Sequence, residues 1–83
     1  MTHEDVMARL KEILQSDFRI PAEKITPEAT FRGTLGLDSL DAVDLIYLVG
    51  KQFGVKAEVD DFRDLHSVQS VVNFVISAKG KAA

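Results

Sequence analysis

The chain has 83 residues, of which 46% are hydrophobic and 28% are charged, and its formal net charge is -3. This length allows one compact domain with a small core and is too short for the walls of a deep catalytic cleft. The negative charge argues against a nucleic-acid-binding protein, because such proteins carry a basic face. The absence of cysteine excludes disulfides, thiolate nucleophiles and zinc sites built from sulfur.

The first half of the chain predicts one helix followed by a long loop. Thr2 and Asp5 nearly form a capping box for a helix over about residues 3–17, whose apolar face comprises Val6, Leu10, Ile13 and Leu14. Residues 18–37 hold both prolines and two glycines, so they should form a loop with at most a short helical turn near residues 27–29. We expect buried residues to anchor this loop: Ile20, Ile25, Phe31 and Leu35.

A second helix is expected over about residues 39–53. Asp38 can cap its start, with Asp41 at the third helical position, and Gly54 can cap its end. Its apolar face should comprise Leu40, Val43, Ile46, Val49 and Phe53. The apolar run 45–49 also fits a buried strand, but the helical spacing of the acids at 38, 41 and 44 favours the helix. Gly50 is a weak point within it, costing about 1 kcal/mol relative to alanine.

The last third of the chain predicts one short helix and one long helix. Residues 60–65 suit one or two helical turns, and Ser67 can cap a final helix with an apolar face of Val68, Val71, Val72, Val75 and Ile76. Residues 79–83 should fray. The predicted fold is therefore all-α: a small four-helix bundle of three longer helices and one short helix, with a long first loop. We expect residues 1–83 to form a single domain and a monomer.

The acidic charge is localised. Residues 38–64 carry seven acids and three bases, a net charge of -4, whereas the remainder carries a net charge of +1. This region is either a solvated helix face or a docking surface for basic partners. The polar first residues and the short apolar run 45–49 predict neither a signal peptide nor a membrane span, so we expect a cytoplasmic protein.

Ser39, at the start of the second predicted helix, is the main candidate for chemistry. Nucleophilic catalysis would need a base, and the only histidines are His3 and His66, in distant parts of the sequence. The three-residue spacing of Asp38, Asp41 and Asp44 does not fit a calcium-binding loop. We therefore expect no catalytic residue and no metal site. Ser39 is either a helix-capping serine or an attachment point, since a helix start favours an attached phosphate.

The residues around Ser39 decide between these two interpretations. Leu35-Gly36-Leu37-Asp38-Ser39-Leu40-Asp41 resembles the signature of the acyl carrier protein family, residue by residue. The resemblance extends over nearly the whole chain, through Phe31, Val43-Asp44-Leu45, Phe53 and Ser67-Val68-Gln69. It implies that a phosphopantetheinyl transferase moves 4′-phosphopantetheine from coenzyme A onto Ser39, and that the thiol of this arm then holds acyl groups as thioesters.

The resemblance also implies partners and a place for the acyl chain. Synthases and acyl-transfer enzymes with basic docking surfaces would bind the second helix through Asp38, Leu40, Asp41, Asp44 and Tyr47. No nucleic acid and no membrane insertion are implied. The aliphatic interior could shelter a fatty chain, and the candidate lining residues, which their spacing makes core residues first, are Ile46, Val49, Leu65, Val71 and Val75.

Some positions depart from the family pattern. Thr34 replaces an acid before the leucine-glycine pair, Gly50-Lys51-Gln52 replaces a glutamate-rich stretch, and Ala57-Glu58 replaces an aliphatic-proline pair. These departures favour a specialised pathway over the housekeeping fatty-acid synthase, among the candidates of fatty-acid, polyketide and specialised lipid biosynthesis. The alternative function is an unmodified acidic helical adaptor that uses the second helix only for docking.

Overall fold

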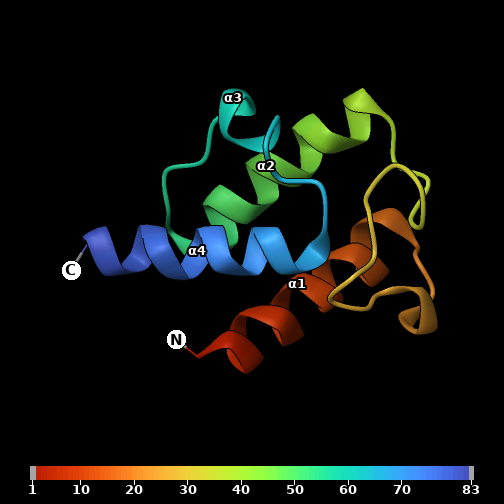
Figure 1. The fold of residues 1–83 in the computed structure, drawn as a ribbon, viewed down its shortest axis with the longest axis horizontal. Helices are drawn as coiled ribbons and strands as arrows, with labels where there is room; N and C mark the ends of the chain where they lie inside the picture. The colour runs from red at the N-terminus through yellow and green to blue at the C-terminus, as the bar shows by residue number, and fades with distance from the viewer. Residues whose placement is uncertain (1, 83) are drawn as a thin grey trace.

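The computed structural model describes residues 2–82. It contains four α-helices, α1 (His3–Phe18), α2 (Ser39–Phe53), α3 (Val59–Phe62) and α4 (Val68–Ala82), and one 3-10 turn, η1 (Ala22–Lys24). α1 packs most closely against α4, α2 crosses above them, and α3 lies beside α2 (Figure 1). The long connection between α1 and α2 runs around one end of the bundle (Figure 1). The all-α bundle predicted from the sequence is confirmed.

Local capping sets the start of α1 as the sequence predicted. The Asp5 backbone N–H donates to Thr2 Oγ1 at 3.1 Å, and the Thr2 backbone N–H donates to Asp5 Oδ2 at 3.2 Å. The backbone hydrogen bond from Thr2 lowers the pKa of the Asp5 carboxyl below its usual range, because it stabilises the charged form. α1 ends at Phe18, and its C-cap, Arg19, has a left-handed backbone with a φ of 55°.

The long connection is held by buried residues along its length. Each of the four predicted anchors is buried, and Ala29 and Leu37 add two more. An isolated antiparallel bridge joins Thr30 to Ser67 and ties the connection to the start of α4. The predicted helical turn at residues 27–29 is wrong: those residues form a hydrogen-bonded turn, and the 3-10 turn lies at η1, directly after Pro21.

One difference from the sequence-based expectation concerns the apolar face of α2. The buried side chains of α2 are Leu45, Ile46, Val49 and Phe53. Leu40 is 76% exposed and Val43 is 46% exposed, so their assignment to the apolar face is wrong. Leu45 belongs to it because it lies four and eight residues before Val49 and Phe53, on one helical stripe. α4 extends to Ala82, and Ala83 lies outside the described residues; the expected fraying of residues 79–83 stays a prediction.

Candidate functional site

The start of α2 is fixed by a reciprocal capping box. The Asp41 backbone N–H donates to Asp38 Oδ1 at 2.9 Å, and the Asp38 backbone N–H donates to Asp41 Oδ2 at 3.2 Å. Asp38 is the N-cap, so Ser39 is the first residue inside the helix. This arrangement satisfies two backbone donors with two carboxylates and leaves the serine out of the capping.

Ser39 is therefore not a capping serine. Its side chain is exposed, and within residues 2–82 no hydrogen bond involves its hydroxyl. A hydroxyl that is exposed and carries no structural hydrogen bond can form a new covalent bond without the loss of a cap. The capping alternative from the sequence is wrong because Asp38 performs that role.

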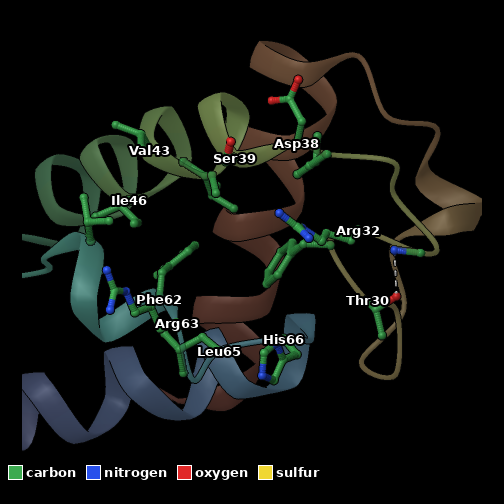
Figure 2. A pocket seen from close by; sticks show the side chains of 16 residues that line it. Thr30, Arg32, Asp38, Ser39, Val43, Ile46, Phe62, Arg63, Leu65 and His66 are labelled. Carbon is green, nitrogen blue, oxygen red and sulfur yellow. Dashed lines mark hydrogen bonds between the residues drawn. The ribbon is translucent and has the colours of Figure 1, made fainter.

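A cavity of about 600 Å³ lies beside Ser39. Its walls come from the end of the long connection, the first two turns of α2, and the segment from α3 to the start of α4 (Figure 2). The lining side chains labelled in Figure 2 are Thr30, Arg32, Asp38, Ser39, Val43, Ile46, Phe62, Arg63, Leu65 and His66. The cavity is mainly apolar, with charged and polar groups on part of its lining, which is the usual chemistry of a small-molecule site.

Two aromatic rings form part of the cavity wall. Phe31 and Phe62 stack with their ring centroids 6.0 Å apart and their planes inclined by 22°. Both rings are buried, and they come from elements far apart in the sequence. The stack therefore links α3, which has only four residues, to the loop before α2.

The five side chains expected to line an acyl-chain pocket fall into two groups. Ile46 and Leu65 lie in the wall of the cavity. Val49, Val71 and Val75 have no exposed surface and do not line it. The sequence did not indicate the role of Arg32 or Phe62 in this wall, because they approach the cavity from separate segments that only the tertiary structure brings together.

The residues expected to meet partner enzymes are at the surface of α2. Leu40 and Tyr47 are 76% and 65% exposed, and Asp38 and Asp44 are also exposed. Asp41 is half-buried and, like Asp38, has one carboxylate oxygen in the capping box. Asp44 is therefore the expected docking acid with no part in helix capping.

The histidine nearest to the site in space is His66. His66 and Ser39 are drawn on opposite sides of the cavity (Figure 2), and within residues 2–82 no hydrogen bond joins them. The same part of the chain contains no group of three or more His, Cys, Asp or Glu side chains placed to hold a metal ion.

Comparisons with known proteins agree with this geometry. A family model described as "Phosphopantetheine attachment site" matches residues 8–75. The acyl carrier protein of Thermosynechococcus vestitus is 33% identical over 75 residues, which is 90% of this chain and 93% of that protein. The acyl carrier protein of Solidesulfovibrio magneticus is 33% identical over 76 residues, which is 92% of this chain and 97% of that protein.

A solved structure shares the fold. The acyl carrier protein of Thermotoga maritima superimposes with a TM-score of 0.85 over 98% of this chain and 94% of that one, at 22% sequence identity. Because the identity is low, this likeness bears on the fold alone. The fold and the attachment motif together define a phosphopantetheine-bearing carrier domain.

The chain belongs to the acyl carrier protein family. It carries acyl groups on a covalent 4′-phosphopantetheine arm and works with acyl-transfer and synthase enzymes, as carriers of this family do. Over residues 2–82, no helix combines the length and the apolar character needed to cross a membrane.

Proposed function

We propose that Ser39 receives the 4′-phosphopantetheine arm and that residues 1–83 act as one carrier domain without catalytic activity of its own. The observation that carries the assignment is the exposed hydroxyl of Ser39 at the first position of α2, which makes no hydrogen bond within residues 2–82. The cavity beside it gives a bound arm an apolar surface to lie against. The side chains at this position therefore fit the group that the family carries.

The residues of this chain have a limited part in the attachment. Ser39 Oγ forms a bond to phosphorus and loses its proton, while the pyrophosphate bond of coenzyme A breaks and its adenosine bisphosphate part leaves. The arm supplies a terminal thiol, which a chain without cysteine lacks. Asp38 and Asp41 hold the helix start rigid and so keep Ser39 accessible to a transferase.

We assign the outer face of α2 to partner enzymes. Asp38, Asp41 and Asp44 would meet basic groups on a phosphopantetheinyl transferase or a synthase, and Leu40 and Tyr47 would supply apolar contacts. The proposal treats the protein as a cytoplasmic monomer that binds neither nucleic acid nor membranes. The pathway is fatty-acid, polyketide or specialised lipid biosynthesis.

An acyl chain on the arm would enter the cavity first. Ile46 and Leu65 would contact it there, because both line the wall. Val49, Val71 and Val75 would contact it only if the guest separated the packed helices, since none of the three is exposed. Short acyl groups therefore need less rearrangement of the core than long ones.

The assignment of Ser39 is tested by intact mass. The protein is incubated with coenzyme A, magnesium and a broad-specificity phosphopantetheinyl transferase, alongside Ser39→Ala and the matched control Ser16→Ala, which removes an exposed serine from α1. The wild type and Ser16→Ala should each gain one phosphopantetheine, and Ser39→Ala should gain none. A gain by Ser39→Ala would disprove the site, and no gain by the folded wild type would favour the unmodified adaptor.

A further inference from the structure

The lining of the cavity beside Ser39 includes a cation, Arg32, that forms no ion pair within residues 2–82. Arg32 lines the cavity from the loop before α2, and its guanidinium is drawn on the Ser39 side of the cavity, below the first turn of α2 (Figure 2). The second arginine of the lining, Arg63, extends from the opposite end, near Ile46 (Figure 2). The two arginines therefore lie at different distances along the cavity from the serine.

The two arginines also differ in their partners. Arg63 Nε lies 3.5 Å from Asp60 Oδ1, an ion pair within one turn of the chain. Within residues 2–82 the only other ion pair joins Lys56 to Glu58, and no hydrogen bond involves the Arg32 side chain. Arg32 thus has its full set of donors available to a ligand.

The loop that carries Arg32 is held in place on both sides of the residue. Thr30 Oγ1 accepts hydrogen bonds from the backbone N–H groups of Gly33 at 3.2 Å and Thr34 at 3.1 Å. The Phe31 N–H donates to the His66 carbonyl at 3.1 Å, which fastens the loop to the start of α4. The guanidinium therefore extends from a fixed backbone, which reduces the conformational entropy lost on binding.

A cation near Ser39 would offset the negative charge of an arm attached there. A phosphodiester on Ser39 Oγ adds one negative charge directly beside the Asp38 carboxylate, and α2 contains no basic residue before Lys51. A guanidinium presents planar paired donors that match two phosphate oxygens. Arg32 is the residue of the cavity lining with this chemistry on the Ser39 side.

We propose that Arg32 binds the phosphodiester of the 4′-phosphopantetheine arm on Ser39 and directs the first bonds of the arm across the mouth of the cavity. The proposal rests on the attachment at Ser39. Arg32 acts here as a positioning residue: it holds the base of the arm and does not react. The bond is electrostatic and lies near the surface, so salt should weaken it.

The test uses the holo protein, in which intact mass confirms the arm. Nuclear magnetic resonance then measures the ³¹P resonance of the arm and the Nε–Hε resonances of the arginines. The Arg32 Nε–Hε resonance should shift between the apo and holo proteins, and the Arg63 resonance should stay unchanged. The ³¹P resonance of the arm should shift in Arg32→Gln and stay at the wild-type position in the matched control Arg63→Gln. Raising the salt from about 50 mM to about 500 mM should move the wild-type ³¹P resonance toward that of Arg32→Gln.

Two results would overturn the proposal, and they differ from failure of the attachment itself. A holo protein in which Arg32 Nε–Hε does not move, or in which Arg32→Gln leaves the ³¹P resonance unchanged, contradicts the contact while leaving Ser39 as the attachment site. If the wild-type protein gains no arm, both the attachment at Ser39 and the contact with Arg32 are contradicted. Arg32→Lys, which keeps the charge but loses the paired donors, should give a ³¹P resonance between those of the wild type and Arg32→Gln.

Discussion

Gly50 shows how a residue that looks unfavourable in the sequence serves the tertiary structure. By helix propensity alone it costs about 1 kcal/mol relative to alanine. In the fold, a Cβ at this position would lie 3.2 Å from the Val55 carbonyl oxygen and 3.8 Å from Ala57 Cβ. The chain after α2 turns back at Gly54, which has a φ of 66°, and passes close to the helix. Gly50 permits that close approach.

Gly50→Ala should therefore fail to stabilise the protein. The gain of about 1 kcal/mol in helix propensity is offset by the tight contact with the Val55 carbonyl, so the free energy of unfolding should stay the same or fall. Gly80→Ala is the matched control, because a Cβ at Gly80 meets nothing within 4 Å in α4. Urea denaturation of both variants measures the difference. Equal stabilisation by the two substitutions would contradict the role assigned to Gly50.

At the start of α2, adjacent residues have separate roles: Asp38 and Asp41 stabilise the helix, and Ser39 is available for modification. Asp38 and Asp41 satisfy each other's backbone donors and fix where the helix begins. The side chain of Ser39, between them, makes no hydrogen bond within residues 2–82. A serine without a structural task can be modified without disturbing the helix that presents it.

Asp38→Ala should lower the free energy of unfolding by about 1 kcal/mol, the usual cost of losing an N-cap. Asp38→Asn should cost only a few tenths of that amount, because an amide oxygen still accepts the hydrogen bond from Asp41. Ser39→Ala should change stability by less than about 0.5 kcal/mol, since its hydroxyl makes no hydrogen bond within residues 2–82. The comparison uses thermal and urea unfolding of the apo proteins. A larger loss in Ser39→Ala than in Asp38→Ala would contradict this division of roles.

At the scale of the whole molecule, charge is separated along the chain. The segment 38–64, which includes α2 and α3, has a net charge of -4, and the remainder has a net charge of +1. The electrostatic field of such an uneven charge distribution orients a carrier as it approaches a basic enzyme surface. The apolar side chains of Leu40 and Tyr47 lie exposed within the acidic segment, where a partner could cover them.

Asp44→Lys should slow modification of Ser39 by the transferase by about threefold to tenfold at low salt, with a smaller effect at high salt. Asp44 is the suitable position because, unlike Asp41, it takes no part in the capping box. Glu12→Lys makes the same change in net charge on α1 and should have little effect. The measurement is kcat/KM for arm attachment at two ionic strengths. Equal effects of the two reversals would indicate a response to net charge alone.

The sequence by itself determined the features that depend on neighbouring residues. The capping boxes of α1 and α2, the left-handed end of α2 at Gly54, and the burial of the loop anchors were all readable from residue types and spacing. The attachment motif was readable for the same reason, since its residues are consecutive. Capping and helical periodicity involve residues within four positions of each other, so no tertiary information is needed.

The tertiary structure alone decided what lies next to Ser39. Arg32, Phe62 and His66 reach one cavity from separate segments, and the bridge between Thr30 and Ser67 aligns two of those segments. It also decided that Leu40 faces outward while Leu45 enters the core. An apolar side chain at helical spacing can serve either as core or as docking surface. Only the packing of the other helices determines which apolar side chains of α2 are buried and which stay exposed.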